Sequence, residues 1–231
     1  MITQEKSLIL LRHNTRKFMK HSRENFVIAI GRQFGSGGRE IGRLVAQRLN
    51  IAYYDKELLT EAAKSSGMNC DFFEAADERS PKFFASLMAF STGYHCGSFL
   101  VGSTPISNDN IYHQQSEVIQ ALAERSSCVI MGRTADYILR NSPNTISIFI
   151  HASIEQRIAR IMTRNDCKTA AEARSLAEKK NKMRAEYYNF YTEKRWGEAE
   201  SYDLSIDSSK LTTEATANII VQYVKTRLGL E

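Results

Sequence analysis

The chain has 231 residues, of which 42% are hydrophobic and 25% are charged, so it has ordinary globular composition and fits one α/β domain with insertions. Its net charge of +5 suits anionic partners, but this excess is too small to indicate nucleic acid, which we do not expect to bind. The longest apolar run near the start, residues 8–11, is too short for a membrane span, and the four cysteines lack zinc-site spacing, so we expect a cytoplasmic protein without a membrane segment.

Predicted strands and helices alternate along the chain after a polar, basic extension over residues 1–25. Five short apolar segments are typical of buried strands, and they cover residues 26–30, 51–54, 127–132, 144–152 and 202–207. Apolar residues at helical spacing follow the first strand, from Ile41 to Leu49, and the last strand, from Ala217 to Leu228. This alternation predicts an α/β fold with a mostly parallel sheet covered by helices on both faces.

Two regions interrupt the alternation within a domain over residues 26–231. Residues 68–126 contain a stretch rich in Gly, Ser and Thr, and a helix through Ala62 and Ala63 is expected before them. Residues 168–199 are charged and aromatic, and we expect the aromatic side chains of residues 187–191 to pack in a core rather than stack on bases.

The first predicted strand runs into a turn that contains Gly31, Gly35, Gly37 and Gly38. Glycines permit positive φ angles and let the backbone approach a phosphate closely. A turn that enters a helix also directs free N–H groups and the positive end of the helix dipole at one point. The segment is therefore a candidate phosphate-binding loop, although a glycine turn that binds nothing also fits these residues.

Two standard nucleotide motifs fail to match this turn. The dinucleotide fingerprint G-x-G-x-x-G fails because Glu40 stands at the third glycine position, although Asp55 lies where a ribose-binding acid would be expected. The P-loop pattern G-x-x-x-x-G-K-[ST] fails because Gly38 stands where lysine belongs, and Arg39 and Glu40 follow it.

Arginines recur downstream at the ends of predicted strands. Arg133 follows the third strand in "MGRTADYIL", and the helix after the fourth strand carries Arg157, Arg160 and Arg164 on one face. Arg184 lies in the second insertion. A solvated helix face is a plain alternative for the three helical arginines.

The order of "GSGGREIG", "MGRTADYIL" and "YDLSIDSS" resembles the cytidylate kinase-like branch of the P-loop nucleoside monophosphate kinases, over roughly residues 26–209. The resemblance implies a P-loop NTPase-type three-layer sandwich with a five-stranded parallel sheet. It also implies a helical acceptor-binding lobe after the second strand and a lid before the last strand. Residues 68–126 and 168–199 stand where those two insertions belong.

The resemblance further implies an ATP-dependent kinase that uses Mg²⁺ and a nucleoside monophosphate as phosphate acceptor. The residues matched to nucleotide binding are Gly31, Gly35, Ser36, Gly37, Gly38, Arg39 and Glu40. Those matched to acceptor binding are Asp55, Arg133 and Asp136. The arginines matched to the stabilisation of transferring phosphate are Arg39, Arg133, Arg157, Arg160 and Arg184.

Several departures from the family pattern leave alternatives open. We hypothesise that Arg39 replaces the missing lysine, and the magnesium ligands stay unassigned, with Glu40 and Asp136 as candidates. Asp55 also fits a helix N-cap, and Arg133 and Asp136 also fit a mutual ion pair. A catalytically weak nucleotide sensor and a kinase of a non-nucleotide small molecule are the alternative functions.

Overall fold

The computed structural model describes residues 25–55 and 108–230. Its sheet contains β1 (Val27–Arg32), β2 (Ala52–Tyr54), β3 (Cys128–Met131), β4 (Thr145–His151) and β5 (Leu204–Asp207). The strands pair in the order β2-β3-β1-β4-β5, and every pair is parallel. This confirms the predicted five-stranded parallel sheet. Because all strands point the same way, their carboxyl ends share one edge, where ligands of open α/β sheets bind.

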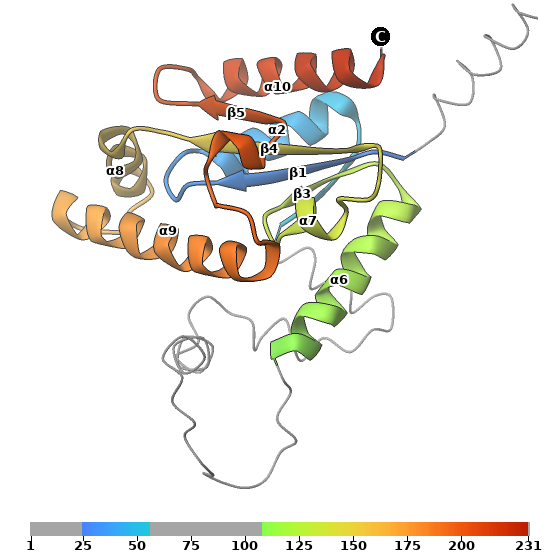
Figure 1. The fold of residues 1–231 in the computed structure, drawn as a ribbon. Coiled ribbons are helices and arrows are strands. Elements are labelled where there is room, and N and C mark those ends of the chain that lie inside the picture. The colour runs from blue at the N-terminus through green and yellow to red at the C-terminus, as the bar shows by residue number, and fades with distance from the viewer. Residues whose placement is uncertain (1–24, 56–107, 231) are drawn as a thin grey trace, which may run out of the picture.

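Helices cover both faces of the sheet, as predicted (Figure 1). On one face lie α2 (Gly38–Leu49) and α10 (Thr213–Leu228), which pack against each other. On the other face lie α6 (Asn108–Arg125) and α7 (Ala135–Ile138). The helices α8 (Ile154–Thr163) and α9 (Ala170–Thr192) pack together beside the sheet, and a short 3₁₀ turn η1 (Ala199–Ser201) precedes β5.

Side-chain alternation along the strands divides the core into two layers. In β1, Ile28 and Ile30 pack towards α2 and α10, whereas Val27 and Ala29 pack towards α6 and α7. Successive side chains of a strand point to opposite faces, so a strand buried on both faces has to be apolar throughout. Continuous apolar strands therefore identified a sheet with two covered faces.

Part of the predicted organisation lies outside the described residues. The extension over residues 1–24, the helix through residues 62–63 and most of the first insertion belong to this part. The described end of that insertion is α6, which packs against α7. The second insertion is largely α9, a helix of 23 residues whose N-terminus is closed by a capping box between Thr169 and Glu172.

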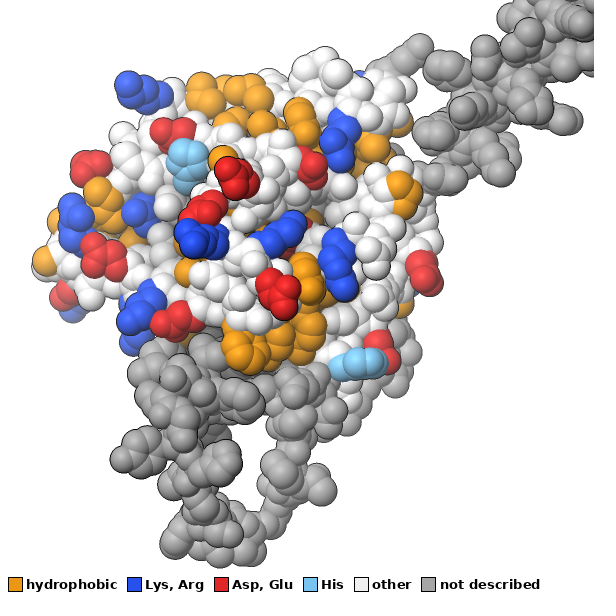
Figure 2. Space-filling model, in the orientation of Figure 1, with side chains coloured by type: hydrophobic (Ala, Val, Ile, Leu, Met, Phe, Trp, Pro, Cys, Tyr) orange, Lys and Arg blue, Asp and Glu red, His pale blue; other side chains and the backbone are white. Residues whose placement is uncertain are grey.

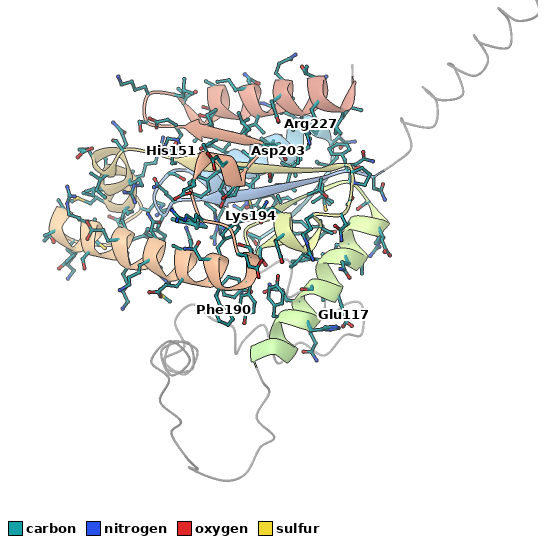
Figure 3. All side chains as sticks on the ribbon, viewed as in Figure 1. Glu117, His151, Phe190, Lys194, Asp203 and Arg227 are labelled. Carbon is teal, nitrogen blue, oxygen red and sulfur yellow. The ribbon has the colours of Figure 1, made fainter. Side chains whose placement is uncertain are left out.

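The surface of the described part carries both signs of charge. Lys and Arg side chains lie among Asp and Glu side chains over the face in Figure 2. Arg227 of α10 pairs with Asp203, just before β5, at 3.3 Å, and both residues are labelled in Figure 3.

Phe190, near the C-terminus of α9, is 50% exposed, so the prediction that the aromatic side chains of residues 187–191 pack in a core is wrong for this residue. Within residues 25–55 and 108–230, no helix combines the length and apolarity that crossing a bilayer requires.

Candidate functional site

The glycine-rich turn leaves β1 and enters α2 at the carboxyl edge of the sheet. Gly35 and Gly37 have φ angles of +84° and +80°, and Gly37 is the N-cap of α2 without any capping side chain. Among the described residues, no acceptor pairs with the backbone N–H groups of Gly35, Gly37 and Gly38. The turn therefore presents backbone donors together with the positive end of a 12-residue helix, the arrangement that favours an anion.

The turn is held from behind by side chains of later elements. Arg160 donates from Nη1 to the Ser36 carbonyl at 3.0 Å, and the buried Ser208 hydroxyl donates to the same oxygen at 2.8 Å. Asn181 of α9 accepts from the Phe34 N–H at 2.8 Å. Because these bonds fix the carbonyl and the flanking amide, the free N–H groups have defined directions.

The arginines of α8 have three different environments. Arg157 is buried, donates from Nε to the Ala152 carbonyl at 3.1 Å, and packs its backbone against Gly35. Burial lowers the pKa of its guanidinium. Arg160 contacts the glycine turn, whereas Arg164 pairs with Asp166 at the surface at 2.8 Å. The solvated-face alternative therefore fits Arg164 alone among the three.

A second turn, between β3 and α7, lies beside the first because β1 and β3 are neighbours. Gly132, Arg133 and Thr134 all have positive φ angles, of +73°, +59° and +52°. Such angles are uncommon in residues other than glycine, and here the Thr134 carbonyl accepts from the N–H groups of Tyr137 and Ile138 at 2.9 Å each. The strained backbone directs the Arg133 side chain towards the edge of the sheet.

Among the residues that the structure describes, Arg133 bonds to an amide side chain and not to a carboxylate. Its Nη1 donates to Gln115 Oε1 at 3.4 Å, and the side-chain nitrogen of Gln115 donates to the Arg133 carbonyl at 3.3 Å. The Arg133 Nη2 atom is buried and has no hydrogen-bond partner among the described residues. Asp136 bonds instead to Tyr188, so the alternative of an Arg133–Asp136 pair is wrong. The buried cationic donor of Arg133 therefore has unmet hydrogen-bonding capacity, which an anionic ligand would satisfy.

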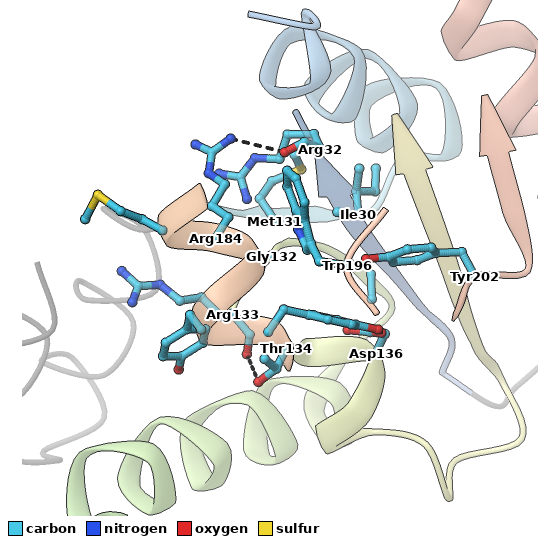
Figure 4. Close-up of a pocket in the computed structure, with 15 residues that line it drawn as sticks. Ile30, Arg32, Met131, Gly132, Arg133, Thr134, Asp136, Arg184, Trp196 and Tyr202 are labelled. Carbon is cyan, nitrogen blue, oxygen red and sulfur yellow. Dashed lines mark hydrogen bonds between the residues drawn. The ribbon is translucent and has the colours of Figure 1, made fainter. Parts of the chain in front are cut away.

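The end of β1, the turn between β3 and α7, and α9 enclose a pocket at the carboxyl ends of β1 and β3 (Figure 4). Its residues come from both strands, the β3–α7 turn, α7, α9 and the segment before β5, and the glycine turn lies next to it through Arg32. They are Ala29, Ile30, Gly31, Arg32, Met131, Gly132, Arg133, Thr134, Asp136, Met183, Arg184, Tyr187, Tyr188, Trp196 and Tyr202. Three arginines from three distant segments thus converge on one small volume.

Asp136, which is half-buried, contributes a carboxyl group to this pocket. The Tyr188 hydroxyl donates to Asp136 Oδ2 at 2.6 Å. Burial raises the pKa of Asp136, while the Tyr188 hydrogen bond and the charge of Lys194 oppose that rise. Tyr187 and Tyr188 form part of the pocket wall, so these two aromatic residues both pack and face the candidate site.

Asp55 and Arg39 lie on the β2 side of the site. Asp55 is 1% exposed and accepts from Arg43 Nη2 at 3.3 Å, and Arg39 Nε lies 3.9 Å from the same oxygen. The Arg39 side chain, which is half exposed, is thus directed at Asp55. Residues 56–107, which directly follow Asp55, lie outside the described residues, so the helix-cap alternative for Asp55 stays a prediction.

The other residues matched from sequence lie close to the glycine turn. Arg184 donates from Nη1 to the Arg32 carbonyl at 3.1 Å. Gly31 and Gly38 are glycines for lack of space, since a Cβ on Gly31 would lie 2.9 Å from the Phe149 ring. Glu40 is exposed in the first turn of α2.

Sequence reasoning missed four residues that shape the site: Arg32, Asn181, Ser208 and Tyr188. Arg32 had a signal, because it directly follows Gly31 at the end of the first predicted strand. The other three act through contacts with segments that lie 52 to 172 residues away, which no local pattern reveals.

Among the described residues, the candidate magnesium ligands are the single carboxylates of Glu40 and Asp136. No group of three or more His, Cys, Asp or Glu side chains gathers within residues 25–55 and 108–230. Mg²⁺ in kinases usually needs only one or two carboxylates, with substrate phosphates and water completing its shell. Glu40 suits such a role better than Asp136, whose raised pKa and tyrosine hydrogen bond disfavour metal ligation.

The chain is similar to known proteins over most of its length. The model of the cytidylate kinase-like family matches residues 27–210. An uncharacterized protein from Eubacterium ventriosum ATCC 27560 is 30% identical, with a TM-score of 0.64 over 88% of this chain and 100% of that chain. Shikimate kinase from Bacteroides thetaiotaomicron is 12% identical, with a TM-score of 0.49 over 89% of this chain and 99% of its own. No curated protein matches the chain. The family match spans both turns, α8, α9 and the sheet, and the chain belongs to the cytidylate kinase-like family.

Proposed function

We propose that the chain transfers the γ-phosphoryl group of ATP to a nucleoside monophosphate at the edge of the sheet between β1 and β3. One observation carries this proposal: free backbone donors at the N-terminus of α2 lie next to a pocket lined by Arg32, Arg133 and Arg184. Membership of a kinase-like family supports phosphoryl transfer in general.

The donor half of the site is the glycine turn. The N–H groups of Gly35, Gly37 and Gly38 bind the phosphate oxygens of ATP, and the dipole of α2 adds to their attraction. Arg160 supports the turn by its bond to the Ser36 carbonyl, and the backbone of Arg157 packs against Gly35. Mg²⁺, when bound with ATP, neutralises charge on the phosphates, and Glu40 is the carboxylate we assign to it.

The acceptor half is the pocket with Arg133. An acceptor phosphate forms paired hydrogen bonds with this guanidinium, whose Nη2 is buried without a partner among the described residues. Arg184 reaches the same pocket from α9. The acceptor phosphate oxygen attacks the γ-phosphorus of ATP, the bond from that phosphorus to the β–γ bridging oxygen breaks, and ADP leaves. Converging arginines offset the repulsion between the two anionic substrates.

A panel of acceptors tests the function. The full chain is incubated with ATP, MgCl₂ and each nucleoside monophosphate in turn, and ADP formation is measured against a reaction without acceptor. ADP that forms only with an acceptor supports the proposal. ATP binding without acceptor-dependent ADP contradicts it and favours the sensor function.

A second candidate is a kinase of a small anionic non-nucleotide hydroxyl compound. The observation that favours it is the carboxyl group of Asp136 in the wall of the arginine-lined pocket. A carboxylate repels an acceptor phosphate but accepts a hydrogen bond from a hydroxyl group. The same panel, extended with hydroxy acids and sugar acids, separates the two candidates.

A further inference from the structure

The glycine turn departs from the P-loop pattern at two positions, and the residues at those positions touch each other. When G-x-x-x-x-G-K is aligned on Gly37, residues 32–38 read R-Q-F-G-S-G-G. Arg32 thus stands where the pattern has its first glycine, and Gly38 stands where it has lysine. A cation is missing at one end of the motif and an additional cation is present at the other.

Packing explains why the residue at position 38 is glycine. A Cβ atom on Gly38 would lie 2.7 Å from Arg32 Cβ and 2.9 Å from Arg32 Cγ, which is closer than real Cβ atoms approach. No positive φ angle is required there, because Gly38 is the first residue of α2 and its φ is not in the left-handed region. The Arg32 side chain therefore occupies the space into which a lysine at position 38 would extend.

The Arg32 guanidinium reaches the place where the two halves of the site meet. Its Nη1 atom lies against Gly132 at the end of β3, and Arg32 lines the pocket together with Arg133 and Arg184 (Figure 4). The Arg184 bond to the Arg32 carbonyl fixes the backbone from which this side chain starts. Arg39, the residue first matched to the missing lysine, is directed at Asp55 on the β2 side instead.

We propose that Arg32 is the phosphate-binding cation of this loop, and that Arg32 and Gly38 form an exchanged pair that replaces the glycine and lysine of the usual P-loop. This inference rests on the proposed function for the identity of the ligand, a nucleoside triphosphate. A guanidinium presents two parallel N–H donors where an ammonium group is a point charge. Arg32 can therefore bind two oxygens at once between the donor and acceptor sites.

The test measures binding of the non-hydrolysable analogue β,γ-imido-ATP with MgCl₂ by calorimetry, on the full chain. Arg32→Met should weaken binding at least about tenfold, the effect of losing charged hydrogen bonds. Arg32→Lys should recover part of that loss. Arg48→Met is the matched control, because Arg48 lies near the C-terminus of α2, the helix that Gly38 begins, and bonds to the Glu214 carbonyl. It should bind the analogue like the unaltered chain.

Exchanging the residue types at positions 32 and 38 tests the proposed pair more directly than the single substitution of Arg32. Gly38→Lys alone should bind poorly or unfold at lower urea concentration, because its Cβ overlaps Arg32. The double variant Arg32→Gly with Gly38→Lys removes the overlap and restores the usual order, so it should bind the analogue more tightly than either Arg32→Met or Gly38→Lys.

Two outcomes would overturn the inference. One is unchanged analogue affinity in Arg32→Met, and the other is a folded double variant that binds no better than Arg32→Met. Failure of the proposed function looks different, since the unaltered chain then forms no acceptor-dependent ADP while the order of analogue affinities still decides the role of Arg32. Urea unfolding of each variant identifies any loss of binding that comes from loss of fold.

Discussion

The two turns at the edge of the sheet present hydrogen-bond donors to the candidate site in different ways. The turn between β1 and α2 uses glycines at positive φ and offers backbone N–H groups. The turn between β3 and α7 places Arg133 and Thr134 at positive φ and offers a side-chain cation. The first turn depends on the absence of side chains, whereas the second depends on a particular one.

Because of this difference, the two turns tolerate different amino-acid substitutions. A backbone site is damaged by any added Cβ, and its ligand specificity comes from shape. A side-chain site tolerates changes around it but loses its function when the guanidinium is removed. The two turns should therefore respond differently to substitution, in stability for the first and in acceptor use for the second.

The largest effect is expected from Gly35→Ala in the first turn. The added methyl group would lie 2.8 Å from the Arg157 carbonyl, and the residue would keep a φ of +84°. Left-handed strain and overpacking together should lower the free energy of unfolding by about 3 kcal/mol, with loss of ATP binding. Gly229→Ala is the control: its φ is also positive but no atom lies within 4 Å, so about 1 kcal/mol is expected. Equal losses in urea unfolding would show that strain alone governs the first turn.

The next effect is expected from Arg133→Met in the second turn. We expect kcat/KM for the acceptor to fall about 10²-fold while ATP affinity stays nearly unchanged, because one preorganised donor is lost. Arg140→Met serves as the control, since Arg140 lies in the same region but stacks on Tyr137 at the surface. Steady-state kinetics and calorimetry measure the two quantities. A fall in ATP affinity would mean that both turns bind the same substrate.

A smaller effect concerns the pH dependence of stability at the second turn. Burial raises the pKa of Asp136 above 3.8, so the folded chain holds this proton more tightly than the unfolded chain. Protonation of Asp136 therefore stabilises the fold at low pH, and this contribution is lost as pH rises from 3.8 through the raised pKa. Asp136→Asn should remove that part of the slope in urea unfolding.

The companion variant Tyr188→Phe should extend this slope to higher pH. The Tyr188 hydrogen bond favours the carboxylate, so its removal raises the pKa of Asp136 further. A slope that is unchanged in both variants would assign the pH dependence to other groups.

The smallest effect is expected where α9 supports the first turn. Asn181→Ala removes the acceptor of the Phe34 N–H and should cost about 1 kcal/mol of stability. Asn189→Ala removes an equivalent bond, 2.8 Å to the Trp196 N–H, near the C-terminus of α9, and should cost about the same. Only Asn181→Ala should also weaken binding of β,γ-imido-ATP. If Asn181→Ala and Asn189→Ala bind β,γ-imido-ATP with equal affinity, the bond from Asn181 to the turn has no role in nucleotide binding.

Much of the fold was predictable because its signals are local. Short segments with apolar residues, such as the one that precedes Gly31, marked all five strands. The glycines at 35 and 37 marked the turn, because only they adopt its φ angles without strain. The resemblance to a kinase family supplied Arg133 and Arg184, and both line the pocket.

The direction of each arginine was not predictable in the same way. Arg39 follows the glycines and matched the missing lysine by position, yet its side chain is directed at Asp55. Arg157 and Arg164 share a helical face by spacing, but one is buried and the other is exposed. The direction of each arginine side chain depends on contacts with residues from other segments, and the spacing of residues in the sequence does not reveal these contacts.

By itself, the amino-acid sequence determined the parallel sheet, the glycine turn and the positions of the arginines along the chain. The sheet and the turn follow from the spacing of apolar residues and from the conformational freedom of glycine, which are both local properties. Only the tertiary structure decided which arginines meet. The carboxyl ends of β1 and β3 are neighbours although about a hundred residues separate Gly31 from Gly132, and α9 returns across both. Arg32 reaches this junction because Gly38 leaves it room, and that room exists only when strand and helix pack together.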